Sequence, residues 1–425
     1  MNRKRFPILL STLAFVLIGR IALSVVTPVF DPSEGRYAAI CANMDRTGDF
    51  LVPSFTHKGV YRSFDGKPPL VFQAGGWACR VFGRNELAVR LPGIVSGLFI
   101  LLFVYRFTKN GKGREAGLVA AGVCLTCTAF LAATGFCMTD IPLSACVAGA
   151  ILLEARFHET GRRLHSLGVF ALLGLGMLIK GPVALALFGL PVTVDAFVNR
   201  RWKAIARHSW FLGLALFFLI AAPWYVLMER QNPGFLEYFF IHENLLRFLV
   251  HDYGDKYGAG RETFRGMAIL WAIVVTLPWT PFVLFAPRHR LRSLPAVGVL
   301  TITGFWCLTS RVPLAYLLPV VPLFAVWIVL ETEDLRRFER LLPYAGGASL
   351  ALLALTLTIT TLASDKMPGH RFRRLLEKHP RAKIAFPRKQ PYSAEFYLGG
   401  HLTNDATQAD IVIERHHGRW EVTEK

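Results

Sequence analysis

The amino-acid sequence predicts an all-α protein that crosses a membrane many times, and three observations lead to this fold class. Hydrophobic residues make up 53% of the 425 residues, and the mean hydropathy is +0.40, which is too apolar for a soluble protein of this length. The apolar residues form runs near the roughly 20 residues that a helix needs to cross a bilayer. Short polar connections separate these runs, and alternate connections are rich in Lys and Arg.

About eleven transmembrane helices are expected. The first run follows Arg3-Lys4-Arg5, and we interpret it as a retained anchor because no small-residue cleavage pattern precedes Phe30. The two runs on either side of Lys180 are the shortest. In chain order, the spans are expected near 6–29, 86–106, 116–134, 140–155, 165–180, 182–199, 209–228, 264–286, 294–310, 313–330 and 342–363.

The distribution of positive charge predicts the orientation of these spans, because basic loops stay in the cytoplasm. With the N-terminus inside, every predicted cytoplasmic connection is basic, and an odd number of spans places the C-terminal tail outside. The cytoplasmic connections are 107–115, 156–164, 200–208, 287–293 and 331–341.

Three outward segments are longer than turns: 30–85, 229–263 and the tail 364–425. Within the first, we expect a helix over 34–46 and an interfacial helix over 70–82. The tail predicts a helix over 371–379, strands over 383–386 and 410–414, and a turn at His417-Gly418. We therefore expect a small α+β C-terminal domain (364–425) beside a transmembrane domain (1–363).

The formal net charge of +19 does not indicate nucleic-acid binding, because much of the excess lies in the predicted cytoplasmic loops, where orientation and anionic lipids account for it. Outward Lys and Arg residues instead favour an anionic ligand such as a phosphate. The seven cysteines are scattered and show no metal-finger spacing, so we interpret them as small buried hydrophobes.

Asp31, Glu34 and Arg36 follow the first span directly. A carboxylate at the water edge of a membrane can orient or deprotonate a hydroxyl, and an arginine can hold a phosphate with two hydrogen bonds. The same residues also suit the first turn of a helix, with Asp31 or Ser33 as its N-cap. Chemistry alone leaves both interpretations open.

Lys67, Asp140 and Lys180 are further candidates. Lys67 precedes two prolines at the start of the interfacial helix, where a snorkelling lysine is the alternative. Asp140 begins a span, where helix capping is the alternative. Lys180 stands beside Gly181-Pro182 inside apolar sequence, and this position favours a functional role.

The last candidates lie near 242 and 311. His242, Glu243 and Arg247 share one side of a predicted helix, and the His/Glu pair is a weak candidate for a divalent cation. Arg311 and Tyr316 stand at the outer boundary of a span. The alternative to a functional role is that Arg311 snorkels to the membrane surface and that Tyr316 belongs to the interfacial belt of aromatic residues.

The order of these motifs resembles the bacterial inner-membrane glycosyltransferases of the dolichyl-phosphate-mannose–protein mannosyltransferase superfamily. The resemblance covers residues 25 to about 330 and is strongest to the lipid A aminoarabinose transferase branch. It rests on Glu34-x-Arg36-Tyr37-Ala38, Gly48-Asp49-Phe50-Leu51-Val52-Pro53, Lys67-Pro68-Pro69-Leu70, Asp140-Ile141-Pro142-Leu143, Lys180-Gly181-Pro182 and Arg311-x-Pro313-x-x-Tyr316-x-Leu318-Pro319. That branch has Asp beside Glu where this chain has Ser33, which leaves open whether Asp31 or Glu34 acts.

The resemblance implies a GT-C fold and transfer of a sugar from a polyprenyl-phosphate carrier to lipid A, or to another glycan or protein acceptor. The reaction would occur at the periplasmic face of the inner membrane, without a required cofactor, metal or nucleic-acid partner. It implies catalytic roles for Glu34, Asp31 and Asp140, and donor-phosphate binding by Arg36, Lys67, Lys180 and Arg311. With the chemistry above, we expect substrate contacts from Tyr37, His242, Glu243, Arg247 and Tyr316.

Three other functions remain as alternatives. An enzyme similar to protein O-mannosyltransferases would take a peptide acceptor, and assays for sugar on protein rather than lipid A would identify it. A lipid or ion transporter would more often place its charges near the midplane on broken helices, and here only Lys180 approaches that. A structural membrane subunit would leave the clustered charges unexplained.

Overall fold

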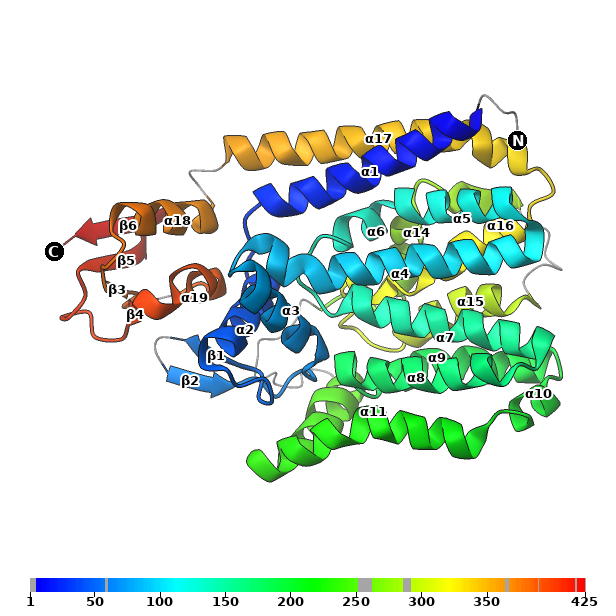
Figure 1. The fold of residues 1–425 in the computed structure, drawn as a ribbon, viewed down its shortest axis with the longest axis horizontal. Helices are drawn as coiled ribbons and strands as arrows, with labels where there is room; N and C mark the ends of the chain where they lie inside the picture. Colours follow the sequence, from blue (N-terminus) through cyan, green and yellow to red (C-terminus); the bar gives the residue numbers. More distant parts are fainter. Residues whose placement is uncertain are drawn as a thin grey trace.

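The computed structural model describes residues 5–57, 60–250, 262–285, 292–363, 367–388, 390–416 and 419–424. Most of these residues are helical, and the long helices run side by side (Figure 1). Within this part of the chain, six helices are long and apolar enough to cross a membrane. They are α1 (Arg5–Val26), α4 (Glu86–Lys112), α7 (Asp140–Thr160), α8 (Arg163–Lys180), α11 (Trp210–Gln231) and α17 (Leu335–Leu362).

Each of the other five expected spans coincides with shorter helices. Three are apolar: α9 (Val183–Val198), α15 (Leu294–Trp306) and α16 (Val320–Glu331). The 116–134 run divides into α5 (Arg114–Thr126) and α6 (Thr128–Ala133), and the 264–286 run into α14 (Met267–Val275) and η2 (Thr280–Phe285). Pro278 lies at the second break, where proline cannot continue a helix. The several apolar helices confirm the fold class, whereas the count of eleven spans stays a prediction.

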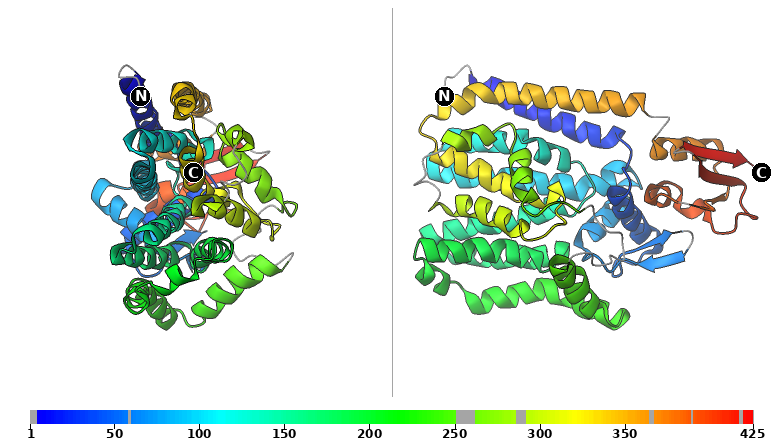
Figure 2. Two further views of the ribbon diagram at one scale, coloured as in Figure 1. Left: turned by 90° about the vertical axis from the view of Figure 1, so that its right-hand side faces the viewer. Right: turned by 180° about the vertical axis from the view of Figure 1, so that it is seen from behind.

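The main core lies between α4, α5, α7, α15 and α16, whose apolar faces meet. α1 packs against α17 at one edge of the bundle, and α11 packs against α8 at the other (Figures 1 and 2). Many side chains on the outer faces of α11 and α17 are exposed large hydrophobics. Such faces are typical of helices that contact lipid.

The segment between α1 and α4 lies at one end of the bundle (Figure 1). It contains α2 (Ser33–Thr47), the hairpin β1 (Ser54–His57) and β2 (Val60–Ser63), and α3 (Leu70–Phe82). α2 and α3 agree with the helices expected over 34–46 and 70–82, whereas the sequence did not predict the hairpin. Near α11, the described part of 229–263 forms α12 (Phe235–Glu237), η1 (Tyr238–Leu246) and α13 (Arg247–Leu249), and α10 (Trp202–Ala206) lies at the opposite end of the bundle.

The C-terminal segment lies beside α2, at the same end of the bundle (Figures 1 and 2). It contains α18 (Pro368–Lys378), β3 (Ile384–Ala385), α19 (Tyr392–Leu398), η6 (Gly399–His401), β4 (Leu402–Thr403), β5 (Ile411–His416) and β6 (Arg419–Glu424). The strand order is β4-β3-β5-β6, with β3 parallel to both neighbours and β5 antiparallel to β6.

The expected helix and two strands of this segment are present as α18, β3 and β5. The turn expected at 417–418 lies outside the described residues. The sequence did not predict α19, which packs on α2. The segment has its own small core, which includes Phe372, Phe386, Ile411 and Trp420.

Candidate active site

A cavity of about 370 Å³ lies at the end of the bundle that also carries α2 and α3. Six of the residues that the sequence singled out line it: Lys67, Lys180, Glu243, Arg247, Arg311 and Tyr316. The rest of the wall is largely apolar and aromatic and includes Val183, Phe240, Phe248, Phe305 and Trp306. The cavity therefore joins a charged side to an apolar side.

Chain reversals bring these residues together. α8 ends at Lys180, and Gly181 has φ +78°, a conformation that suits glycine. A Cβ on Gly181 would lie 2.6 Å from Cζ of Phe239, so this close turn excludes larger residues. Pro182 then precedes α9. The Lys-Gly-Pro motif thus holds the lysine at a helix end that faces the cavity.

Lys180 has two polar neighbours. Its Nζ atom lies 2.5 Å from Oδ1 of Asp140 and 3.8 Å from the centre of the Tyr316 ring. Only 6% of the Lys180 side chain and 14% of the Asp140 side chain are exposed. An ion pair this enclosed is screened little by solvent, so Lys180 offers a fixed positive charge at the cavity wall.

Glu243 joins two further cations. Its Oε1 atom accepts hydrogen bonds of 2.6 Å from Nζ of Lys67 and 2.6 Å from Nη1 of Arg247. Arg311 enters from the α15–α16 connection and lies 3.1 Å from Glu262, measured from Nη2 to Oε1. The cavity wall thus carries four cations, whose carboxylate partners include Glu243, Asp140 and the partly exposed Glu262. Guanidinium and ammonium groups gathered at one wall suit an anionic ligand.

Tyr37 packs among aromatic residues outside the cavity. Its ring packs against Phe72 at 5.3 Å and Phe64 at 6.1 Å between centroids, and it does not line the cavity. Burial raises the pKa of the Tyr37 hydroxyl, Arg36 lowers it, and Asp140 raises it. The hydroxyl therefore stays protonated near neutral pH.

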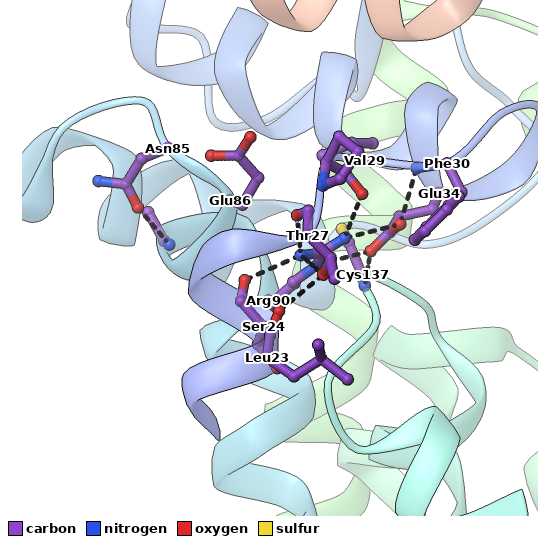
Figure 3. A network of polar contacts seen from close by, with 12 residues as sticks. Leu23, Ser24, Thr27, Val29, Phe30, Glu34, Asn85, Glu86, Arg90 and Cys137 are labelled. Carbon is purple, nitrogen blue, oxygen red and sulfur yellow. Dashed lines mark hydrogen bonds and ion pairs between the residues drawn. The ribbon is translucent and has the colours of Figure 1, made fainter. Parts of the chain in front are cut away.

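Glu34 belongs to a different environment (Figure 3). Its carboxylate accepts hydrogen bonds from Nε and Nη2 of Arg90 at 2.8 and 3.1 Å, and from the backbone N–H groups of Phe30 and Cys137 at 2.9 and 3.0 Å. Both members of this pair are buried, with 4% of the Glu34 side chain and 1% of the Arg90 side chain exposed. Glu34 does not line the cavity, and its contacts join α2, α4 and the chain around Cys137.

Asp31 and Arg36 face the C-terminal segment. Asp31 accepts hydrogen bonds from the backbone N–H of Ser393, at 3.0 Å, and from the Ser393 hydroxyl. The Arg36 guanidinium lies 5.1 Å from the centre of the Tyr392 ring. The three candidates that follow the first span are therefore not brought to the cavity, which Lys180 lines and which Asp140 reaches only through its ion pair with Lys180.

His242 stacks on Tyr238, with ring centroids 6.1 Å apart, and does not line the cavity. Its expected metal partner, Glu243, is occupied by Lys67 and Arg247. Among the described residues, no three His, Cys, Asp or Glu side chains form a group that could hold a metal ion. The geometry gives no support to a divalent cation at His242 and Glu243.

Sequence reasoning overlooked two buried arginines. Arg90 also donates to the carbonyl oxygens of Ser24, Thr27 and Pro28, and Arg20 donates to those of Leu131 and Ala132. Both stand inside apolar runs, so the criterion that selected Lys180 would also have found them. The aromatic wall of Phe248, Phe305 and Trp306 had no comparable signal, because aromatic residues are common in every span.

Comparison with known proteins supports the resemblance seen in the motifs. Residues 66–226 match the family model of dolichyl-phosphate-mannose-protein mannosyltransferases. The undecaprenyl phosphate-alpha-4-amino-4-deoxy-L-arabinose arabinosyl transferase of Erwinia tasmaniensis is 29% identical over 233 residues, which are 54% of this chain and 41% of that protein. The protein of the same description from Aeromonas hydrophila is 27% identical over 257 residues, 59% of this chain and 45% of its own. The chain thus matches less than half the length of these two relatives.

Solved structures show the same fold over nearly the whole chain. ArnT from Cupriavidus metallidurans, in a crystal structure with undecaprenyl phosphate bound, superposes with a TM-score of 0.72 and 20% identity, covering 92% of this chain and 85% of that one. The archaeal oligosaccharyltransferase AglB from Archaeoglobus fulgidus gives a TM-score of 0.51 at 16% identity, covering 95% and 65%.

Fold and motifs together define the class: the chain is a multi-pass membrane protein with the GT-C fold. Residues 66–226 resemble the dolichyl-phosphate-mannose-protein mannosyltransferases, and just over half of the chain is similar to arabinosyl transferases of the aminoarabinose branch.

Proposed function

We propose that this chain is a polyprenyl-phosphate-sugar-dependent glycosyltransferase that moves an aminoarabinose-like sugar to lipid A. The observation that carries the proposal is the cavity lined by Lys67, Lys180, Arg247, Arg311 and Glu243 next to an apolar wall. Asp140 pairs with Lys180 at its edge. A polyprenyl phosphate has the matching chemistry, since its phosphate is anionic and its tail is apolar. The relatives named for undecaprenyl-phosphate-linked aminoarabinose add support.

The proposal includes the orientation of the protein. We place the N-terminus in the cytoplasm and the cavity at the periplasmic face of the bacterial inner membrane, because the predicted connections at the opposite end are basic. We also propose eleven spans, and we assign residues 364–425 to a separate periplasmic domain beside the membrane domain 1–363. Its described part packs on α2 at the cavity end of the bundle.

In the proposed reaction, an acceptor oxygen attacks the anomeric carbon from the side opposite the phosphate. The new carbon–oxygen bond forms as the bond to the carrier phosphate breaks, and the polyprenyl phosphate leaves with the bonding electrons. Lys180, Lys67 and Arg311 stabilise the negative charge that develops on that phosphate. Holding both reactants in line supplies much of the acceleration.

The carboxylates have separate roles in this proposal. Asp140 fixes Lys180 at 2.5 Å, and we assign to it the orientation of the acceptor. Glu243 positions Lys67 and Arg247. A hydroxyl acceptor would give its proton to a carboxylate, whereas a lipid A phosphate is already ionised and needs none. Catalysis by Glu34 or Asp31 stays a prediction, and their contacts favour a role in positioning α2 and α19.

Replacing Lys180 tests the proposal. We expect Lys180→Ala to lower sugar transfer at least about 100-fold, because it removes a fixed charge from the phosphate position. The matched control is Arg163→Ala, which removes an exposed cation from the other end of α8 and should keep activity. Mass spectrometry of lipid A from cells that express each variant, normalised to protein abundance, measures the effect.

Two results would contradict the proposal. One is lipid A that carries the same sugar with and without the parental chain. The other is full transfer by Lys180→Ala. If the sugar were found on protein and not on lipid A, the proposed acceptor would be wrong, and the proposed lipid-linked donor would stand.

A further inference from the structure

A second cavity of about 370 Å³ lies at the opposite end of the helix bundle from the candidate active site. Asp140 begins α7 beside the first cavity, whereas His158, near the other end of α7, lines the second. The two residues are 18 positions apart in α7, which corresponds to about 27 Å of helix. α15 likewise has its last residues in the first cavity and its first residues in the second. The two cavities are therefore separate sites at opposite ends.

The polar side of the second cavity carries positive charge. Arg201 and Arg207, on either side of α10, line it together with His158 and Glu159. Arg201 lies 3.4 Å from the buried Asp195, and Glu159 pairs with Arg156. No ion pair is found for Arg207 among the described residues, and its side chain is exposed.

His158 lies in the wall of the second cavity between two carboxylates, with its Nδ1 atom 3.9 Å from Oδ2 of Asp195. Only 6% of its side chain is exposed, and neither ring nitrogen has a hydrogen-bond partner among the described residues. Its Nε2 atom lies 2.8 Å from Oε1 of Glu154 without hydrogen-bond geometry. A buried imidazole in this state costs free energy unless something else binds it.

Ser293 adds a second unused group from another element. It precedes α15 as the N-cap residue, yet its side chain makes no capping hydrogen bond. Its hydroxyl is buried without a partner among the described residues, and it lines the same cavity. Serine at this position normally accepts from the first turn of its helix. The start of α15 therefore presents free donors and a partial positive charge to the cavity.

The remaining wall is apolar and consists of Phe107, Ala155, Leu294, Pro295 and Leu330. From this combination we propose that the second cavity binds a phosphate group, held by Arg207, Arg201, His158 and Ser293, and that its source is the headgroup of an anionic phospholipid. The apolar wall beside the cations matches the junction of headgroup and acyl chain. This site goes beyond sugar transfer and does not depend on it.

The test measures lipid binding by the purified full-length protein. Native mass spectrometry gives the affinity for phosphatidylglycerol and for phosphatidylcholine with the same acyl chains. We expect the parental protein to prefer phosphatidylglycerol, and Arg207→Ala to reduce that preference about fivefold, the usual contribution of one arginine near an anionic lipid. His158→Gln should reduce it as well. The matched control is Arg340→Ala, which removes an exposed arginine near the start of α17.

A second measurement separates the two sources of phosphate and guards against misfolding. Thermal unfolding is followed in detergent with and without millimolar inorganic phosphate. Two results together support the lipid headgroup as the ligand. Inorganic phosphate leaves the melting temperature unchanged, and the Arg207→Ala variant loses the preference for phosphatidylglycerol. Stabilisation by inorganic phosphate that Arg207→Ala abolishes supports a phosphate site but makes the free anion its ligand. Absence of both effects, or an equal loss in Arg340→Ala, would refute the site.

Discussion

At the scale of single residues, burial and partners decide what each charged group can do. Lys180 and Arg90 both stand in apolar sequence. Lys180 has one carboxylate partner at a cavity wall, so it keeps capacity for a ligand. Arg90 makes hydrogen bonds to Glu34 and to three backbone carbonyls, so its donors are used within the protein. The two cations therefore have different roles despite similar sequence surroundings.

The Glu34–Arg90 pair leads to a prediction about stability. Glu34→Gln should destabilise the fold by about 3 to 5 kcal/mol, because it leaves the buried Arg90 charge without its counter-charge. The melting temperature of purified protein checks this. Glu377→Gln, which changes an exposed carboxylate on α18, should leave it unchanged. A Glu34→Gln variant with parental stability but no transfer would restore Glu34 as a catalytic candidate.

At the scale of elements, small residues determine how closely the helices outside the main bundle approach. Gly75 and Gly76 of α3 lie against α2. A Cβ on Gly75 would be 2.5 Å from Sγ of Cys41, and one on Gly76 would be 3.1 Å from Cβ of Met44. The positions of Lys67, just before α3, and of Tyr37, on α2, both depend on this packing.

Replacing Gly75 by alanine and replacing Gly347 by alanine should have opposite effects on stability. Alanine is the better helix former by about 1 kcal/mol, so Gly347→Ala in α17, where a Cβ would meet nothing within 4 Å, should be neutral or stabilising. Gly75→Ala should instead lower the melting temperature, because Cys41 must move. Equal melting temperatures for the two variants would show that α2 and α3 have room to separate.

At the scale of the whole molecule, polar contacts fasten the C-terminal segment to the bundle. Glu395 lies 2.9 Å from Arg46, Oε1 to Nη1, and Tyr397 donates to Glu86 at 2.7 Å. Burial raises the pKa of Glu395 from 4.5 to about 7, although Arg46 opposes the shift. The segment thus carries a carboxylate that titrates near neutral pH at its contact with α2.

This shift predicts the pH dependence of docking. Between pH 4.5 and 7 the folded state binds a proton that the unfolded state has lost, so the stability contributed by the protonated group falls as pH rises. The change is on the order of 3 kcal/mol. Limited proteolysis of the segment should therefore be faster at pH 8 than at pH 5.5.

Glu395→Gln isolates this effect. The variant should flatten the pH dependence, and Glu377→Gln should keep the parental profile. His370, whose pKa is lowered by burial, is present in both the parent and the variant. Its contribution to the pH dependence therefore cancels when the two are compared. A pH profile unchanged by Glu395→Gln would assign the titration to another group.

The helical membrane architecture, the helices α2 and α3 and the charged residues that line the cavity could all be predicted from local sequence. Local patterns suffice for these features, because apolar run length and glycine–proline turns act over short distances. Which charges meet depends on the packing of distant helices. Asp140 and Lys180 are 40 residues apart, Glu34 and Arg90 are 56 apart, and Asp31 binds Ser393 across 362 residues. Such pairings depend on how helices pack, and therefore no motif distinguished the carboxylates near the cavity from those that hold the fold together.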